Sequence, residues 1–162
     1  MKTVTNWVNG IVTDKAKLAH WLSRQFVGEM LAAQRVQKLS TKVSGKLKPV
    51  IERIAKDEAM HAGWVKSLLV SRNLPIPEVT YDDDRYWQAV FKDVNESIPN
   101  VLALGAHAEK MRLHRIKAIV GDTRFDEDIR AVFSKILPDE EFHAKAFSAA
   151  AGKNALERTR EN

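Results

Sequence analysis

Two short stretches of the sequence repeat an aspartate, a glutamate and a histidine at the same spacing among apolar residues. The first, IAKDEAMHAGWV, covers residues 54–65, and the second, ILPDEEFHAKAF, covers residues 136–147. The repeated residues are Asp57, Glu58 and His61 in the first copy and Asp139, Glu140 and His143 in the second. Residues three positions apart on a helix project from the same face, so each glutamate would point the same way as its histidine.

The apolar residues around both copies indicate that these faces point into a protein core. Ile54 and Val65 flank the first copy, and Ile136 and Phe147 flank the second. A buried ionised carboxylate without a partner costs several kcal/mol in lost hydration. Two divalent cations shared by the carboxylates and imidazoles would offset that cost. The chemistry that the pattern predicts is therefore metal binding inside a helical core.

Hydrophobic residues at helical spacing predict the elements that carry these motifs. We expect four long helices and one short helix, which Pro99 would end. The long helices cover about residues 14–40, 45–73, 100–120 and 126–151, and the short helix covers about residues 83–97. Asp14 is expected to cap the first helix, and Pro138 is expected to bend the last one.

The longest connection, NLPIPEVTYDDD at residues 73–84, contains two prolines and cannot continue a helix. It divides the chain into two helical hairpins. The predicted fold is therefore all-α, a four-helix bundle of two antiparallel hairpins joined by a long crossover with an extra short helix. We expect a single domain over residues 1–162, with the bundle core over about 14–150 and a frayed tail over 151–162.

Antiparallel geometry identifies two further carboxylates. Facing residues of an antiparallel hairpin lie at equal distances from its turn. Counted back across the first turn, Glu58 faces residue 29 or 30, and residue 29 is Glu29. Counted back across the second turn, Glu140 faces residue 108 or 109, and residue 109 is Glu109. Four glutamates and two histidines are thus predicted to meet in one dinuclear metal site.

This set of motifs resembles the ferritin-like di-iron carboxylate superfamily. That group includes rubrerythrins, bacterioferritins, the small subunit of ribonucleotide reductase, aldehyde-deformylating oxygenases and tRNA hydroxylases. The resemblance covers roughly residues 14–150, and EMLAAQR from Glu29 aligns with EKMRLHR from Glu109 as a repeat between the two halves. It implies a ferritin-like bundle that holds two iron ions per chain. Manganese is the alternative metal, because oxygen and nitrogen ligands suit both.

The resemblance also implies a role for each residue of the set. These roles are terminal ligands for Glu29 and Glu109, bridging ligands for Glu58 and Glu140, and ligands of one metal each for His61 and His143. Asp57 and Asp139 match the outer carboxylates that accept the free ring N–H of a metal-bound histidine on the opposite helix. We expect crossed pairs, Asp57 with His143 and Asp139 with His61.

Other residues near the motifs are expected to lie outside the metal site. Arg112 and His114 follow Glu109 closely, and we expect surface or outer-layer positions for them rather than ligation. His20 and His107 are expected to be ordinary helix residues. Small residues near the site either leave room for a substrate or mark close helix crossings, and the sequence favours neither reading; they are Gly28, Ala32, Ala33, Gly105 and Ala106.

Composition excludes several other classes of protein and of cofactor site. Hydrophobic residues make up 44% of the chain and charged residues 29%, and no run approaches the ~18 apolar residues of a membrane span. The absence of cysteine excludes disulfides, iron–sulfur clusters and a rubredoxin-type centre within this sequence. The N-terminal residues lack the features of a secretory signal, so we expect a cytoplasmic protein. The net charge is +5, and its scattered lysines and arginines favour a solvated surface over an anion-binding patch.

The predicted function is a dinuclear iron-binding, oxygen-activating oxidoreductase. It would be an oxidase or monooxygenase acting on a small organic or nucleic-acid-borne substrate. One alternative is an iron-handling ferroxidase or a peroxide-reducing protein similar to rubrerythrin. Another is a helical interaction module without a redox metal, which would dock on RNA. The expected partners are dioxygen or peroxide, an unidentified small-molecule substrate and an external electron donor, and exposed helix faces make a homodimer reasonable.

Overall fold

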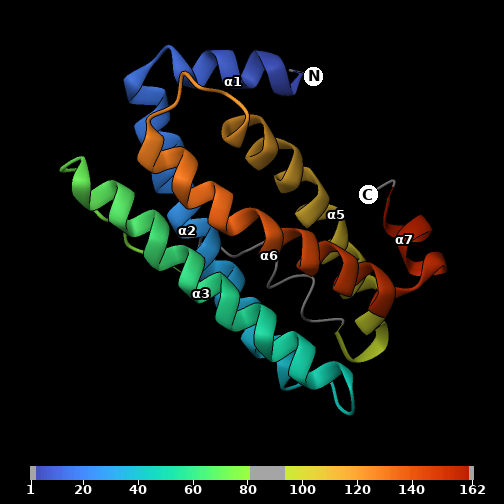
Figure 1. Ribbon diagram of the computed structural model, residues 1–162. Coiled ribbons are helices and arrows are strands. Elements are labelled where there is room, and N and C mark those ends of the chain that lie inside the picture. The colour runs from blue at the N-terminus through green and yellow to red at the C-terminus, as the bar shows by residue number, and fades with distance from the viewer. Residues whose placement is uncertain (1–2, 81–93, 161–162) are drawn as a thin grey trace.

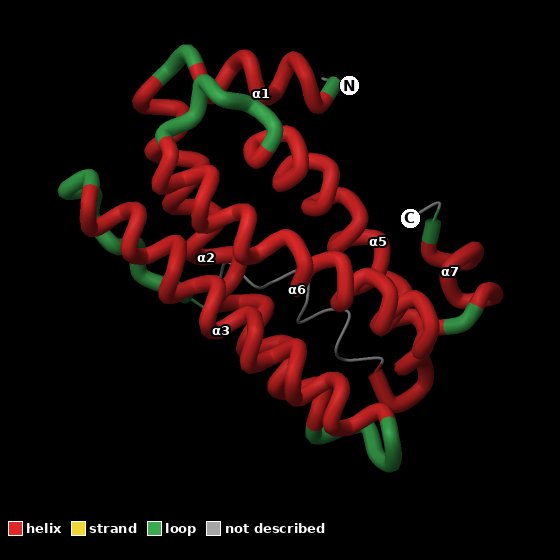
Figure 2. The backbone as a smooth tube through the Cα atoms, viewed as in Figure 1, coloured by secondary structure: helices red, strands yellow, loops and turns green. Residues whose placement is uncertain are grey.

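The protein is a bundle of helices in the computed structural model, which describes residues 3–80 and 94–160 (Figures 1 and 2). The helices in these ranges are α1 (Val4–Val12), α2 (Lys15–Ser40), α3 (Leu47–Ser71), α5 (Val94–Val120), α6 (Glu127–Ala151) and α7 (Lys153–Thr159). The described ranges contain no strand. The prediction of an all-α bundle is confirmed. None of the described helices combines the length and apolar character that crossing a membrane requires.

Helix α2 pairs with α3, and α5 pairs with α6, so that each pair forms an antiparallel hairpin (Figure 1). Contacts between α3 and α6 join the two hairpins. At one end of this seam, the guanidinium of Arg72 binds Asp126 at 3.0 Å and Asp128 at 2.8 Å. The end of α3 therefore lies beside the start of α6, which brings the two repeated motifs to the same height of the bundle.

Local signals place the helix ends close to where the sequence predicts them. The Asp14 carboxylate accepts hydrogen bonds from Ala16 N at 3.0 Å and Lys17 N at 3.2 Å, as expected of an N-cap. The turn between α2 and α3 contains Gly45 at a φ of 64°, a left-handed conformation that suits glycine. Asn73 takes a similar φ of 54° just after α3.

The start of α5 differs from the prediction. The sequence predicts a short helix at 83–97 that Pro99 ends and a new helix from 100, whereas α5 begins at Val94 and contains Pro99. The proline lies in the second turn and removes one backbone hydrogen bond, a cost that the remaining helix outweighs. Residues 83–93 of the expected short helix lie outside the described residues, as do residues 81–84 of the crossover.

Both ends of the described chain contain helices that the sequence analysis does not predict. Helix α1 packs on the bundle through Trp7, whose ring lies 5.4 Å from that of Trp21. Helix α7 replaces much of the expected frayed tail, and its residues Ala155 and Thr159 are buried. Helices this short are marginal alone and depend on tertiary contacts, which periodicity in so few residues does not reveal.

Helix α6 continues through Pro138 without interruption. The bend expected at this position stays a prediction. The proline comes two residues before Glu140, and because the helix is unbroken it still carries the second motif on a continuous helical face.

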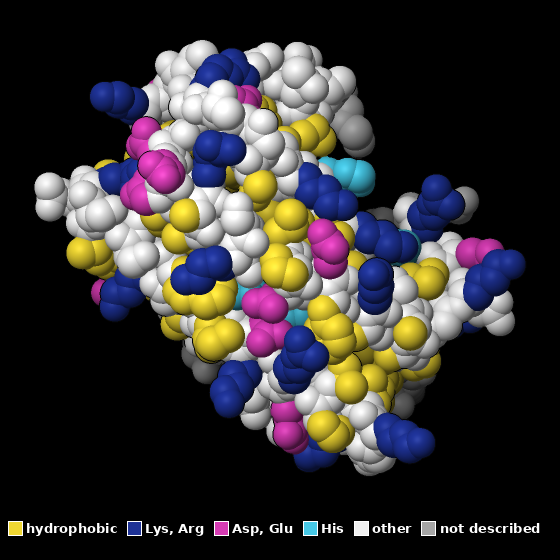
Figure 3. All heavy atoms as spheres, in the orientation of Figure 1, with side chains coloured by type: hydrophobic (Ala, Val, Ile, Leu, Met, Phe, Trp, Pro, Cys, Tyr) yellow, Lys and Arg dark blue, Asp and Glu magenta, His cyan; other side chains and the backbone are white. Residues whose placement is uncertain are grey.

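The apolar core is divided into two clusters with a polar layer between them. One cluster, at the α1 end, contains Leu22 and Phe133. The other, at the α7 end, contains Ile51, Leu102 and Phe147. The repeated motifs lie between these clusters, midway along the bundle. On the face shown in Figure 3, lysine and arginine side chains are dispersed among acidic and apolar ones instead of forming one patch.

Candidate metal centre

The structure brings the predicted ligand residues together in the polar layer. All of them are buried, and Glu109 is the most exposed at 6%. They come from all four bundle helices: Glu29 from α2, Glu58 and His61 from α3, Glu109 from α5, and Glu140 and His143 from α6. The helical spacing of each motif accounts for this convergence, because residues three apart share the inward face of α3 or α6.

These residues form two overlapping donor groups. In each group, one donor atom per residue lies within 4.8 Å of the others. The first group is Glu29, Glu58, His61 and Glu140, and the second is Glu58, Glu109, Glu140 and His143. Glu58 and Glu140 belong to both groups. Each group therefore has one glutamate and one histidine of its own, together with two shared glutamates.

The two histidines are held by carboxylates of the opposite hairpin. Nε2 of His61 lies 2.8 Å from Oδ2 of Asp139, and Nε2 of His143 lies 3.0 Å from Oδ2 of Asp57. These are the crossed pairs expected from the sequence. The other ring nitrogen of each histidine faces the glutamates. Nδ1 of His61 lies 3.3 Å from Glu140, which leaves Nδ1 as the nitrogen available to a metal.

Aromatic side chains pack near both histidines. The ring of Trp64 lies 5.5 Å from that of His61, and the ring of Phe142 lies 6.2 Å from that of His143. A cation lies over each aromatic ring, with Lys135 Nζ 4.3 Å from the Trp64 ring and the Arg53 guanidinium 3.9 Å from the Phe142 ring. The imidazoles are thereby shielded from water, which strengthens their interactions with charged groups.

Arg112 reaches into the cluster and contacts the carboxylates, so of the surface and outer-layer positions expected from the sequence it takes the outer-layer one. Its guanidinium pairs with Glu29, lies 3.4 Å from Glu140, and approaches Glu58 at 3.5 Å. The signal that could have identified it is its position three residues after Glu109, which places both side chains on one face of α5. Arg112 thus supplies a positive charge among the carboxylates.

Burial and the neighbouring charges give the buried glutamates different pKa values. Burial, together with the charges of Glu29 and Glu140, raises the pKa of Glu58 to about 8. Burial also raises the pKa of Glu109 well above its ordinary value. Burial acts in the same direction on Glu140, but the charge of Arg112 and its other neighbours hold the pKa of that carboxyl well below its ordinary value.

The imidazoles hold their protons firmly among these carboxylates. Burial favours the neutral form of His61, but Glu140 and Glu29 outweigh it and raise the pKa of His61 to about 11. Glu140 and Glu58 likewise outweigh burial and raise the pKa of His143 to about 10. Protons on these residues partly balance the buried negative charge. Divalent cations would replace those protons, because a metal binds the deprotonated ligand.

The donor atoms fit a metal pair in a further respect. Most buried polar atoms of a folded protein have a hydrogen-bond partner. Among the described residues, several buried atoms of the ligand set lack a partner in acceptable geometry: Glu29 Oε2, both carboxylate oxygens of Glu58 and Glu140, Glu109 Oε2, and Nδ1 of His61 and His143. These are the oxygen and nitrogen donors that iron and manganese bind. Metal ions would satisfy them.

The remaining predicted bystanders lie elsewhere. His114 is exposed on α5, and His20 is exposed on α2. His107 Nε2 lies 3.0 Å from the carbonyl oxygen of Leu156 and 3.1 Å from Thr159 Oγ1, so it connects α5 to α7. None of these three histidines belongs to either donor group of the described residues.

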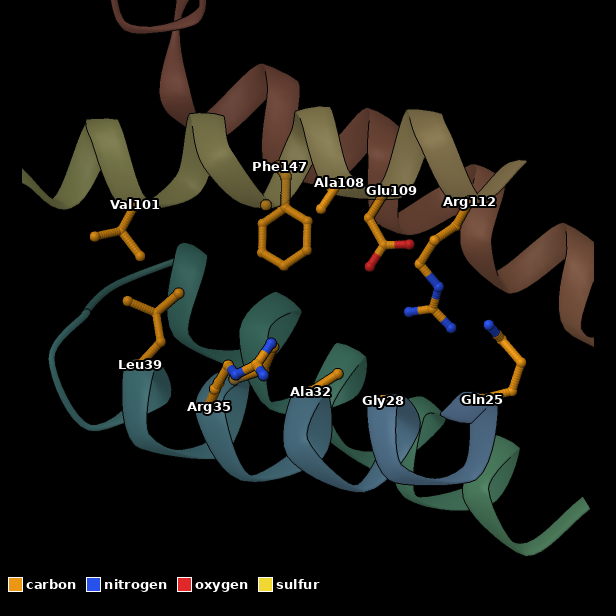
Figure 4. A pocket seen from close by; sticks show the side chains of 12 residues that line it. Gln25, Gly28, Ala32, Arg35, Leu39, Val101, Ala108, Glu109, Arg112 and Phe147 are labelled. Atoms are coloured by element: carbon orange, nitrogen blue, oxygen red, sulfur yellow. The ribbon is translucent and has the colours of Figure 1, made fainter. Parts of the chain in front are cut away.

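A cavity of about 260 Å³ lies between α2 and α5 and reaches the cluster at Glu109 and Arg112 (Figure 4). Gly28, Ala32 and Gly105 line it, so three of the small residues leave space here. Gly105 also marks a close crossing, since a Cβ at this position would meet the Phe147 ring at 3.4 Å. The two readings left open by the sequence therefore both apply.

Comparison with known proteins gives one match. The Rubrerythrin family model matches residues 20–151, a range that contains all six predicted ligands and both outer aspartates. No curated protein and no solved structure matches the chain. The matched range covers most of the sequence and agrees with the helical bundle and its polar layer. The chain belongs to the rubrerythrin family, one of the ferritin-like di-iron carboxylate families.

Proposed function

We propose that this protein binds two iron ions in the polar layer and works as an oxygen-activating oxidoreductase on a small organic substrate. The observation that supports the proposal is the pair of donor groups that share Glu58 and Glu140. Glu29 and His61 would complete one metal site, and Glu109 and His143 the other. The oxygen and nitrogen donors also suit manganese.

Two adjacent iron(II) ions supply the electrons needed to reduce dioxygen or peroxide. The residues of the chain prepare the site for them. The shared glutamates lie within reach of both donor groups, and the crossed aspartates fix the rings of His61 and His143 with Nδ1 turned inward. Burial of the polar layer excludes water, and Arg112 supplies a further positive charge where negative charge gathers.

The cavity supports substrate oxidation over iron handling alone. It contacts Glu109 at the cluster, and its walls are mostly apolar, including Leu39, Val101 and Phe147. A monooxygenase would transfer one oxygen atom of dioxygen to the substrate and release the other as water. Two electrons and two protons would come from an external donor, because the sequence has no cysteine for a rubredoxin-type centre.

Peroxide reduction is the second candidate function, and the family match supports it. In that case peroxide would accept two electrons and two protons and leave as two molecules of water, with no organic substrate required. The same six ligand residues would serve both reactions. The two candidates differ in whether the cavity takes part.

Metal loading and optical kinetics test the proposal. Protein loaded anaerobically with Fe(II) should hold two iron ions per chain and develop a rapid absorbance change when mixed with dioxygen. A Glu58→Ala, Glu140→Ala double variant lacks both shared ligands and should show neither result. Wild-type iron binding at the level of this double variant would refute the metal site. Oxidation faster with peroxide than with dioxygen, and unaffected by filling the cavity through Gly28→Leu, would favour peroxide reduction.

A further inference from the structure

Arg112 contacts three glutamates of the cluster through particular oxygen atoms. Its Nη2 pairs with Oε1 of Glu29 and lies 3.4 Å from Oε1 of Glu140, and its Nη1 lies 3.5 Å from Oε2 of Glu58. These three glutamates, together with His61, make up the first donor group. The guanidinium therefore lies against the carboxylates of one of the two metal positions.

The oxygens that face His61 are partly shared with Arg112. Nδ1 of the histidine lies 3.5 Å from Oε2 of Glu29 and 3.3 Å from Oε1 of Glu140. The Glu29 carboxylate is therefore divided, because Oε1 pairs with Arg112 and Oε2, which has no hydrogen-bond partner, faces the ring. Oε1 of Glu140 lies near both the ring and the guanidinium. A metal on Nδ1 of His61 would thus share two carboxylates with a fixed cation.

The second donor group meets Arg112 differently. Nδ1 of His143 lies 2.8 Å from Oε1 of Glu58 and 3.6 Å from Oε2 of Glu140. Arg112 approaches the opposite oxygen of each of these carboxylates. Among the ion pairs of the described residues, none joins Arg112 to Glu109, although the two lie three residues apart on α5. Figure 4 shows their side chains extending separately from α5 toward α2.

A fixed positive charge beside one metal position makes the two positions unequal. The guanidinium repels a divalent cation bound to the adjoining carboxylates, and burial of the cluster strengthens this repulsion because little water screens it. The pairing of Arg112 with Oε1 of Glu29 also keeps that carboxylate from binding a metal through both oxygens. Both effects act mainly on the position beside His61.

We propose that Arg112 is a built-in cation that weakens the metal position of Glu29 and His61, so that the first ion binds beside His143 and the second beside His61. The inference rests on the proposed function, because it concerns how the same metal pair is filled. The dinuclear centre is complete only when the weaker position is occupied. Arg112 would therefore set the concentration of free metal at which the protein becomes competent to react with dioxygen or peroxide.

Calorimetric titration of metal-free protein with Mn(II) tests the proposal. At about pH 8.5, where protons compete less for the ligands than at lower pH, the wild-type protein should bind two ions in two steps. The two affinities should differ by at least ~10-fold, because the repulsion acts at one position in a buried site. His143→Ala should remove the tighter step, and His61→Ala the weaker one. Two equal steps, or loss of the tighter step in His61→Ala, would overturn the proposal.

Variants of Arg112 identify the cause of the difference. Arg112→Gln should tighten the weaker step by at least ~10-fold and leave the tighter step unchanged. Arg112→Lys keeps the positive charge and should retain two unequal steps. Lys110→Gln removes the same charge from an exposed position on α5 and should change neither step. An unchanged or weaker second step in Arg112→Gln, or two equal steps in Arg112→Lys, would contradict the assignment.

Electron paramagnetic resonance gives a readout that a general loss of stability does not produce. Wild-type protein with one equivalent of Mn(II) should show the resolved hyperfine lines of an isolated ion, because the position beside His61 stays empty. A second equivalent should broaden the spectrum through coupling between adjacent ions. Arg112→Gln should show part of the coupled signal at the first equivalent. A coupled signal from the wild-type protein at the first equivalent would refute the unequal filling.

Metal analysis separates the two hypotheses. Protein that binds no Mn(II) or Fe(II) contradicts the proposed function, and the inference falls with it. Protein that binds two ions per chain with equal affinity contradicts only the inference.

Discussion

His61 on α3 and Asp139 on α6 lie 2.8 Å apart although they belong to different hairpins. His143 and Asp57 repeat the relationship in the opposite direction at 3.0 Å. Each histidine thus has its ring orientation fixed by a residue from the hairpin across the seam. The pairing directs Nδ1 toward the glutamates and raises the basicity of that nitrogen as a ligand.

Asp139→Asn should weaken metal binding without removing a ligand. The amide is neutral and no longer stabilises the positive charge that His61 gains on binding a metal, so we expect a loss of about 10- to 100-fold in affinity for one of the two ions. Competition titrations with a chromogenic chelator measure this. Glu127→Gln, at an exposed position on the same helix, should leave both affinities unchanged.

His61→Ala should reduce the bound metal from two ions per chain to one. The substitution removes the only nitrogen donor of the first group and leaves its carboxylates in place. His114→Ala should keep both ions, because this histidine is exposed on α5. Elemental analysis of the two purified variants measures the difference. Loss of an ion from His114→Ala, with both ions retained in His61→Ala, would contradict the assignment of His61 as a ligand.

Raising the pH should destabilise the metal-free protein. Folding raises the pKa of His61 from 6.5 to about 11, that of His143 from 6.5 to about 10, and that of Glu58 from 4.5 to about 8. The folded state therefore binds more protons than the unfolded state above pH 6.5, and the free energy of unfolding falls as the pH rises toward 10.

Metal should reverse this trend, because it competes with protons for the same atoms. The increase in Tm that Mn(II) causes should grow between pH 6.5 and 8.5, since fewer protons must then be displaced from residues whose pKa values are raised. Calorimetric melting with and without Mn(II) across this range measures both effects. A metal-induced increase that shrinks with pH would contradict the assignment of His61 and His143 as ligands.

Arg72→Gln should loosen the seam between the hairpins at a modest cost. The guanidinium binds Asp126 and Asp128, whose side chains are partly exposed, so we expect a loss of about 0.5–1 kcal/mol in the free energy of unfolding, less at high salt. Lys66→Gln is a control with the same change of charge, because this side chain is exposed on α3. Denaturant unfolding of both variants tests this, and an equal loss from both would show that the seam gains nothing from the contact.

Helical phase made most of the fold and the candidate site predictable. The spacing of Glu58 and His61 places both on one face of a helix, and the antiparallel hairpin then brings Glu29 to the same height. These relationships depend only on the regular geometry of helices, which sequence spacing encodes directly. The pairing of Asp139 with His61 follows from the resemblance to the di-iron superfamily, since spacing along one helix does not show which ring a carboxylate contacts.

The features that escaped prediction depend on contacts between elements. An outer-layer position was one of the two expected for Arg112, but its contact with Glu29 across the bundle was not predicted, because spacing along one helix cannot show where a long side chain ends. Pro99 lies inside α5 because the proline removes one backbone hydrogen bond, a cost that the rest of the helix outweighs. Helix α7 is held through His107 and Thr159, a contact between residues distant in sequence.

The sharing of glutamates between the donor groups has a consequence for local unfolding. Each hairpin contributes three residues to its own group and lends one glutamate to the other, so neither hairpin can detach without opening both groups. The ions would therefore join the two hairpins into one cooperative unit. Amide hydrogens at the centres of α3 and α6 should exchange with solvent at different rates in metal-free protein, and at one common, slower rate once both ions are bound.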